Sequence, residues 1–430
     1  MADLTVETDP AEAGLDPVRL SRIDRHFARY VEDGRLPGWL LTIRRHGSVV
    51  HVAACGERDV AAALPVETGT LWRIYSMTKP VTSVAAMMLA EEGAFELTDP
   101  VSEFIPSFAS LRVYAGGSDL RMVTVPATEP VRIWHLLTHT AGLTYGFHRV
   151  HPVDAAYRAA GFEWSTPRGM DLAGCCDAWA SLPLLFQPGA EWNYSVATDV
   201  LGRVVEVASG QRLDEFLASR ILGPLGMTDT AFHVPAEKAS RLAALYAPRP
   251  ATGPGAAGEA EGSGPVRRFV RLEALSHVPD HPPRLCSGGG GLISTARDYN
   301  RFLDMLLDRR DSPAGEVDGV RLLSPRTVAF MTRNHLPGGA DLATFGRPLY
   351  AESPFTGTGF GLGFAVLLDA TAAATLSTEG EYSWGGAAST AFWVDDAEDL
   401  TVTFFTQLLP SSTYPIRSQL RQLVYQAMVR

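Results

Sequence analysis

The two ends of the chain carry mirrored patterns of secondary structure, and this symmetry constrains the fold more than any other feature. Apolar spacing predicts a helix and then two strands near the N-terminus, over 16–33, 39–43 and 49–52. Asp16 and Pro17 are placed as the N-cap and first-turn residues of that helix. Near the C-terminus the order is reversed, with two strands and then a helix, over 391–394, 400–405 and 416–428. We therefore expect the two ends to share one antiparallel sheet.

The long middle of the chain is predicted to be mainly helical, and its clearest segments are 131–137, 171–181, 198–208 and 213–221. The expected fold is of the α/β (α+β) class: an antiparallel sheet flanked by helices, built from both termini, with an inserted helical lobe. We place the α/β lobe at 1–115 and 290–430 and the helical lobe at 116–289. The stretch 251–265 is almost entirely Gly, Ala, Pro, Ser and Glu and is expected to form a flexible loop.

The overall charge excludes some classes of partner. The chain has 430 residues, with 48 acidic against 37 basic side chains and a formal net charge of −11. Nucleic-acid binding depends on clustered Lys and Arg, which the sequence lacks, so no nucleic-acid partner is expected. The sequence has neither a secretory signal pattern nor an 18-residue apolar stretch, which predicts no membrane association. Four cysteines without CxxC spacing are expected to be reduced thiols in a cytoplasmic protein.

A candidate nucleophile precedes an apolar helix. Ser76 and Lys79 stand three residues apart, and Pro80 is tolerated only in the first turn of a helix. The spacing therefore puts the hydroxyl and the amine on one face at the helix N-terminus, where backbone N–H groups favour a developing negative charge. This is the S-x-x-K arrangement of serine acyl-transfer enzymes.

The choice of cation strengthens this interpretation. Of the 37 basic residues, only Lys79 and Lys238 are lysines. Arginine cannot lose its proton at accessible pH, whereas a lysine can be tuned by its surroundings. A lysine retained three residues after Ser76 therefore indicates an amine whose protonation matters, while Lys238 has no comparable setting.

Four motifs together resemble a known family. They are SMTK at 76–79, LLTHTAGL at 136–143, QPGAEWNYS at 187–195 and PLGMTDT at 224–230. With them, the chain resembles the serine β-lactamase class C/penicillin-binding-protein-like superfamily from about residue 12 to its end. The fold that this resemblance implies, an α/β lobe made from both termini and a helical lobe, agrees with the pattern described above.

Two departures from the family pattern bear on activity. The second family motif, Y-x-N, is matched by Tyr194, but Val196 stands where an asparagine is usual. The third motif, K-T-G, is matched by Trp384-Gly385-Gly386, with tryptophan in place of lysine. The chain is therefore most similar to the family VIII carboxylesterases and related acyltransferases. The missing Asn and Lys weigh against a β-lactamase.

The resemblance also implies roles for individual residues. Ser76 is the expected nucleophile, Tyr194 the base and Lys79 the partner that tunes both. Tyrosine and lysine side chains both have ordinary pKa values near about 10, so which of the two is the immediate base stays open. The backbone N–H groups of Ser76 and Ala387 are expected to form an oxyanion hole. Gly385 and Gly386 would let the strand backbone approach a substrate, and Trp384 would shape the pocket wall.

Other residues near the motifs receive weaker assignments. The aromatic side chains expected to line an acyl or alcohol pocket are Tyr145, Phe147, Trp192 and Tyr382. His135 and His139 lack the Glu of H-E-x-x-H and a third ligand, so we interpret them as structural and expect no metal. The glycine run 288–291 is expected to form a turn into a strand near the site and not a phosphate loop.

The sequence therefore predicts a serine esterase that hydrolyses carboxylic esters, with small or short acyl groups, through an acyl-enzyme on Ser76. Neither a metal nor an organic cofactor is implied, the expected partner is a small-molecule ester, and the oligomeric state is left open. An acyltransferase of the same chemistry, a β-lactamase or D-amino-acid peptidase, and a non-catalytic binding protein are the alternatives. The last is disfavoured because Ser76, Lys79 and Tyr194 are all present.

Overall fold

The computed structural model describes residues 4–163, 167, 169–249, 267–276, 278–309, 312–347 and 355–429. The flexible loop expected at 251–265 lies outside these residues. Within them, no helix is long and apolar enough to span a lipid bilayer.

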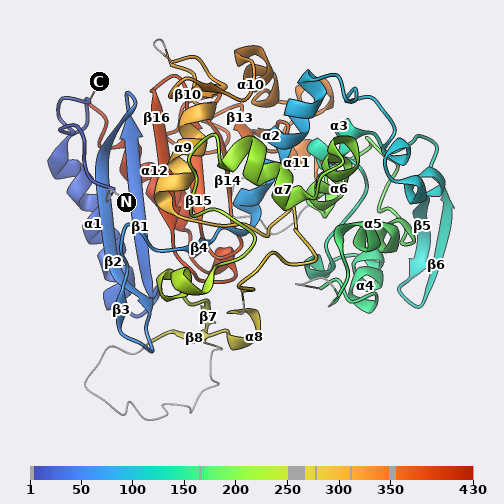
Figure 1. Ribbon diagram of the computed structural model, residues 1–430, viewed down its shortest axis with the longest axis horizontal. Helices are drawn as coiled ribbons and strands as arrows, with labels where there is room; N and C mark the ends of the chain where they lie inside the picture. The colour runs from blue at the N-terminus through green and yellow to red at the C-terminus, as the bar shows by residue number, and fades with distance from the viewer. Residues whose placement is uncertain are drawn as a thin grey trace.

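An antiparallel sheet of eight strands forms the left half of Figure 1, in the order β12-β13-β14-β15-β16-β1-β2-β3. Its N-terminal strands are β1 (Gly38–Arg45), β2 (Ser48–Asp59) and β3 (Leu64–Pro65). Its C-terminal strands are β12 (Thr358–Phe360), β13 (Ala365–Leu367), β14 (Tyr382–Gly385), β15 (Ala391–Asp395) and β16 (Leu400–Phe405). The two groups meet where β1 pairs with β16, in a register that sets Leu40 opposite Phe405. The predicted sharing of one sheet by both ends is confirmed.

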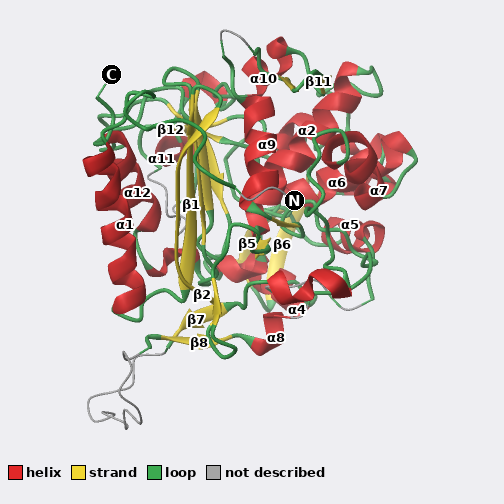
Figure 2. Cartoon of the chain, turned by 60° about the vertical axis from the view of Figure 1, so that its left-hand side comes forward, coloured by secondary structure: helices red, strands yellow, loops and turns green. Residues whose placement is uncertain are grey.

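Helices cover both faces of this sheet, as Figure 2 shows. The terminal helices α1 (Pro17–Glu32) and α12 (Ile416–Tyr425) lie side by side on one face. The predicted N-cap is confirmed, because the Asp16 carboxylate accepts hydrogen bonds from the backbone N–H groups of Val18 and Arg19. The apolar side of α1 buries Phe27 against Trp39 and Phe404 of the sheet. Helix α9 (Ala296–Leu306) packs against β16 from the opposite face.

The middle of the chain forms the helical part predicted from sequence, on the right of Figure 1. Helix α6 (Ala197–Ser209) is at its centre and contacts four other helices. These are α2 (Thr78–Glu91), α3 (Ile133–Leu137), α5 (Leu172–Ala180) and α7 (Leu213–Leu217). The shorter helices are α4 (Pro152–Ala159), α8 (Glu273–Ser276), α10 (Pro325–Met331) and α11 (Leu342–Phe345). The mixed α/β fold, with a helical part joined to a two-ended sheet, agrees with the predicted class.

Short two-stranded elements were not anticipated by the sequence patterns. Two are hairpins, β5 (Arg112–Ser118) with β6 (Arg121–Pro126), and β10 (Glu316–Val317) with β11 (Val320–Arg321). Two join more distant segments, β4 (Trp72–Arg73) with β9 (Ile293–Ser294), and β7 (Tyr246–Pro248) with β8 (Phe269–Arg271). The expected boundary between residues 115 and 116 falls inside β5.

Candidate active site

Ser76 sits where a short 3-10 turn, Tyr75–Met77, runs into the N-terminus of α2. Pro80 is the third residue of α2, where its missing N–H costs no intrahelical hydrogen bond. Tyr75 adopts a left-handed backbone conformation with φ of +44°, which turns the chain sharply just before Ser76. The side chain of Ser76 is half-buried, whereas Lys79 is almost completely buried, with 1% of its surface exposed.

The ammonium group of Lys79 has three acceptors for its three protons. Its Nζ atom lies 2.7 Å from the Gly289 carbonyl oxygen, 3.0 Å from the Tyr145 hydroxyl and 3.4 Å from Ser76 Oγ. A carbonyl oxygen can only accept, so Lys79 donates at least one proton to Gly289. All three acceptors are uncharged. The buried cation is therefore solvated by neutral oxygens that replace water.

Tyr194 completes the group from the segment just before α6. Its hydroxyl shares a hydrogen bond of 2.6 Å with Ser76 Oγ. The centre of its ring lies 4.5 Å from Lys79 Nζ. The three residues singled out from sequence are thus brought within direct contact of one another.

Two histidines, the half-buried His148 and the buried His139, fix the position of Tyr194. His148 donates from Nε2 to the Tyr194 carbonyl over 2.8 Å. The His139 ring packs 5.0 Å from the Tyr194 ring, and its Nδ1 atom lies 3.2 Å from Ser195 Oγ. Burial lowers the pKa of both histidines, that of His139 well below 6.5, so both are neutral at pH 7.

The two histidines considered as metal ligands have separate structural partners. His135 accepts a hydrogen bond at Nδ1 from the backbone N–H of Arg132 over 3.1 Å. His139 contacts Tyr194 and Ser195, as described above. Their interpretation as structural residues is therefore supported by the contacts of each ring.

The glycine run forms a turn that leads into β9, as the sequence predicted, and this turn holds the main acceptor of Lys79. Asp199 fixes it, since its Oδ1 atom accepts from Ser287 Oγ over 2.5 Å and from the Gly289 N–H over 3.0 Å. Space is so restricted that a Cβ atom on Gly289 would stand 2.4 Å from the Asp199 carboxylate. Burial raises the pKa of Asp199 above 3.8, although the nearby charge of Lys79 opposes this.

Sequence reasoning missed Asp199 and the carbonyl of Gly289. The only sequence signal for Asp199 was a carboxylate in the first turn of a helix whose following residues are mainly apolar. A backbone carbonyl leaves no signal in a sequence. Both contribute through tertiary contacts alone.

The third motif lies at the end of β14, beside the turn that carries Ser76. A Cβ atom on Gly386 would stand 2.4 Å from the carbonyl oxygen of Ile74, so a side chain there would push β14 away from the turn. The space that a side chain on Gly386 would occupy is therefore filled by the backbone of the protein itself. The backbone N–H groups of Ser76 and Ala387 have no acceptor within the described ranges.

Three of the predicted pocket residues border the site. Trp384 is half-buried, with its ring 5.3 Å from that of Tyr194. Tyr145 and Phe147 stack on each other with ring centres 4.6 Å apart, and both are half-buried. Burial and the nearby Tyr194 raise the pKa of Tyr145 well above 10, so its hydroxyl stays protonated beside Lys79.

Two of the predicted pocket residues belong to the core instead. Trp192 is 1% exposed and stacks 6.4 Å behind Tyr194. Tyr382 is fully buried and donates its hydroxyl hydrogen bond to the Leu306 carbonyl over 3.0 Å. Neither side chain has surface left to offer a substrate, because their positions beside the motifs in sequence do not bring them to the surface of the site. We correct both assignments to structural roles.

Several known proteins match most of the chain. The model of the Beta-lactamase family matches residues 23–426. Esterase EstB of Burkholderia gladioli is 34% identical to the chain, over 97% of the chain and 98% of EstB. Protein Rv1367c of Mycobacterium tuberculosis is 36% identical, over 88% of the chain and 87% of that protein. The solved structure of EstCE1, described as a hydrolase with promiscuous acyltransferase activity, superposes with a TM-score of 0.73. It is 28% identical and covers 95% of this chain and 99% of EstCE1.

The resemblance inferred from the four motifs is thereby confirmed at the level of the family. The matched region contains both halves of the sheet and the helical part between them. The chain belongs to the Beta-lactamase family and is a serine hydrolase of that fold.

Proposed function

We propose that this protein is a serine esterase that hydrolyses carboxylic esters with short acyl groups through an acyl-enzyme on Ser76. The observation that carries the proposal is the 2.6 Å hydrogen bond between the hydroxyls of Tyr194 and Ser76 beside the buried cation of Lys79. A nucleophile paired with a base that a third group tunes is the common design of covalent acyl transfer. The identity with Esterase EstB supports the choice of an ester substrate.

In the first half of the reaction, Ser76 Oγ attacks the ester carbonyl carbon and its proton passes to the Tyr194 oxygen. The carbonyl oxygen becomes an oxyanion, which the N–H groups of Ser76 and Ala387 stabilise. When the tetrahedral intermediate collapses, the alcohol leaves with the proton held by Tyr194. A water molecule then repeats the sequence on the acyl-enzyme and releases the acid.

Lys79 acts in this scheme as a positively charged partner of Tyr194. Its three protons point to three neutral acceptors, and its Nζ lies 4.5 Å from the centre of the Tyr194 ring. An ammonium group has no lone pair, so Lys79 cannot accept the Ser76 proton in this state, whereas the Tyr194 oxygen lies 2.6 Å from Ser76 Oγ. This arrangement supports Tyr194 as the immediate base.

Acyl transfer to an alcohol is the second candidate, and the likeness to one solved structure favours it. EstCE1 is described as a hydrolase with promiscuous acyltransferase activity. Water and an added alcohol would compete for the same acyl-enzyme. Product analysis with an ester substrate in the presence of 1-butanol separates the two outcomes, because a transferase forms mainly the butyl ester.

The test compares the wild type with Ser76→Ala on nitrophenyl esters of increasing acyl length and on a chromogenic cephalosporin. Ser83→Ala is the matched control, since Ser83 lies on the same helix and its buried Oγ has no partner among the described residues. We expect Ser76→Ala to lower ester turnover by at least about 10³-fold and Ser83→Ala to change it little. Unchanged turnover in Ser76→Ala would refute the mechanism, and faster turnover of the cephalosporin than of the esters would indicate a β-lactamase.

The proposal extends to partner and location. A small-molecule ester is all that the site needs to bind, and a cytoplasmic location is supported by four cysteines that form no disulfide. Burial raises the pKa of Cys175 and Cys286 to about 12, so these thiols are unreactive. Cell fractionation of a tagged full-length chain tests the location, and recovery outside the cytoplasmic fraction would contradict it.

A further inference from the structure

The turn that follows β14 is tied together by an arginine from the C-terminal helix. Arg417 donates from Nη2 to the carbonyl of Gly386 over 3.2 Å and to the carbonyl of Thr390 over 3.1 Å. The Gly386 carbonyl also accepts from the Ser389 N–H over 3.1 Å, and the Gly386 N–H donates to the Thr390 carbonyl over 3.0 Å. The guanidinium group thus joins the two ends of this turn.

Gly385 leaves room for that contact. A Cβ atom on Gly385 would stand 2.2 Å from Arg417 Nη2 and 2.3 Å from its Cζ atom. The absence of a side chain therefore admits a guanidinium group directly against the backbone of the third motif. This gives Gly385 a different role from Gly386, whose missing side chain admits the carbonyl of Ile74.

The chemical consequence follows from the amide bond itself. The carbonyl of Gly386 and the N–H of Ala387 belong to one peptide group, whose electrons are delocalised over oxygen, carbon and nitrogen. A cation hydrogen-bonded to the oxygen draws electron density from the nitrogen and makes the N–H a stronger donor. The N–H of Ala387 is one of the two donors assigned above to the oxyanion.

We propose that Arg417 is a positioning residue for the oxyanion hole, which strengthens the Ala387 N–H through the Gly386 carbonyl. This inference rests on the esterase function proposed above. Arginine suits the role because its charge is permanent and its planar fork can reach two carbonyl groups at once. The effect is largest in the tetrahedral intermediate and the transition states on either side of it, because the substrate oxygen carries negative charge there that it lacks in the bound ester.

The experiment compares Arg417→Gln, Arg417→Met and Arg417→Lys with the wild type on a nitrophenyl ester. Arg19→Gln is the matched control, because Arg19 donates to the carbonyl of Gln426 over 3.1 Å, just beyond the other end of the same helix. Both neutral variants are expected to lower kcat by about 10-fold, a part of what loss of a whole oxyanion donor costs, with little change in KM. The lysine variant keeps the charge and should lie closer to the wild type. If Arg417→Gln does not fold, Arg417→Met carries the test.

A second readout separates this role from a merely structural one. Ser76 adds to the carbonyl of a trifluoromethyl ketone, its proton passing to Tyr194, and the product is an oxyanion in the hole. The corresponding trifluoromethyl carbinol has no carbonyl to attack and no charge, so it only occupies the pocket. The neutral variants should lose affinity for the ketone by the same factor as kcat/KM and keep their affinity for the carbinol. Equal losses for both ligands, or wild-type kcat in both neutral variants, would overturn the proposal. Failure of the Arg417 proposal can be told apart from failure of the esterase proposal. The latter would show as ester turnover that survives Ser76→Ala.

Discussion

The two lysines of this arginine-rich chain occupy opposite kinds of surroundings. Lys79 is buried, and its hydrogen-bond partners within the described residues are neutral oxygens of Ser76, Tyr145 and Gly289. Lys238 is 28% exposed and lies 2.7 Å from the carboxylate of Asp229. Lys238 contacts a carboxylate directly, whereas Lys79 contacts hydroxyl and carbonyl oxygens and lies 4.5 Å from the centre of the Tyr194 ring. The scarcity of lysine therefore marks a reactive group only where no carboxylate among the described residues contacts the amine directly.

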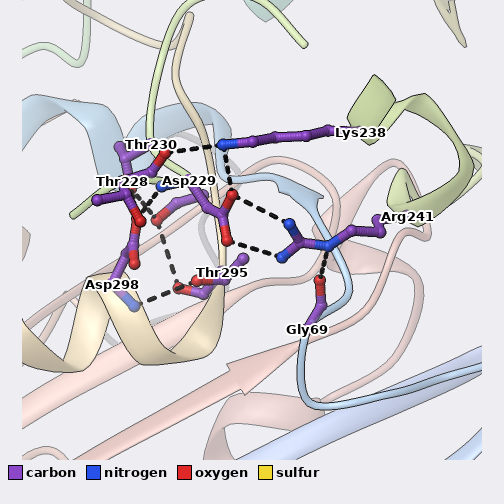
Figure 3. A network of polar contacts seen from close by, with 9 residues as sticks. Gly69, Thr228, Asp229, Thr230, Lys238, Arg241, Thr295 and Asp298 are labelled. Carbon is purple, nitrogen blue, oxygen red and sulfur yellow. Dashed lines mark hydrogen bonds and ion pairs between the residues drawn. The ribbon is translucent and has the colours of Figure 1, made fainter. Parts of the chain in front are cut away.

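Figure 3 shows the polar contacts around Lys238. Arg241 binds the same Asp229 carboxylate through two hydrogen bonds of 2.8 and 3.0 Å, and Lys238 also donates to the Thr228 carbonyl over 2.9 Å. On the other side, Asp298 accepts from the Asp229 N–H and from the Thr230 hydroxyl. This network joins the segment that precedes β7 to α9. Its role is structural, because Arg241 and Lys238 both pair with the same carboxylate of Asp229.

Exchanging each lysine for arginine should give the largest difference in activity between the two sites. Lys79→Arg is expected to lower kcat/KM by about 10³-fold, because a planar guanidinium group cannot direct protons at three acceptors arranged around one nitrogen. Lys238→Arg keeps its pairing with Asp229, so its kcat/KM should remain within about 2-fold of the wild type. Steady-state kinetics on a nitrophenyl ester measure both. Near-normal activity in Lys79→Arg would show that positive charge alone is sufficient.

Removing the shared carboxylate tests the structural network. Asp229→Asn should lower the free energy of unfolding by about 2 kcal/mol at pH 7, because it leaves Lys238 and Arg241 without their anion. Burial alone would raise the pKa of Asp229, but hydrogen bonds from Arg241 and Lys238 lower it below 3.8. The stabilisation is therefore present above the unfolded pKa and lost as pH falls through the folded pKa. Urea unfolding at several pH values measures it, and a difference that grows in acid would contradict this assignment.

Neutralising Asp199 tests how the acceptor of Lys79 is held. Asp199→Asn can keep both hydrogen bonds through its amide oxygen, but it removes the negative charge behind Lys79, and kcat should fall by about 10-fold. Because burial raises the pKa of Asp199, its carboxyl stabilises the fold below the unfolded pKa, and this contribution is lost as pH rises through the folded pKa. The variant should therefore be at least as stable as the wild type at pH 7. Lower kcat combined with lower stability would indicate a disrupted turn instead.

The smallest effect is expected from Lys238→Ala. Its partner Asp229 keeps Arg241, and the lost ion pair is partly exposed, so the free energy of unfolding should fall by less than about 1 kcal/mol. Ester turnover should not change. A thermal melt and one kinetic assay suffice, and a loss of turnover would mean that the two lysine sites are coupled.

Much of the fold could be predicted because local signals agreed with it. The strand predicted at 400–405 matches β16, and the Asp16 cap sets the start of α1. The helix predicted at 213–221 was too long, since α7 ends at Leu217 and the chain continues as a single π turn. Helical spacing does not distinguish an α from a π turn in so short a segment.

The site could be predicted only in part, for a related reason. Ser76 and Lys79 are three residues apart, so local geometry brings them together. Lys79 reaches Tyr145 and Gly289 across 66 and 210 residues, and no local pattern encodes either contact. Tyr145 was therefore expected as a pocket aromatic and not as a partner of Lys79. Trp192 and Tyr382 were misplaced because a position beside a motif does not determine which way a side chain points.

The pairing of β1 with β16 has a consequence for biosynthesis. Leu40 and Phe405, which face each other across these strands, are separated by most of the chain, so the centre of the sheet cannot close until the ribosome has released its last strands. Until then β1 has no partner along the edge that β16 later takes, and α1 lacks its contact with α12. Contacts between residues so far apart in the sequence form late and slowly during folding. Newly made chains should therefore depend on chaperones until the C-terminal segment arrives.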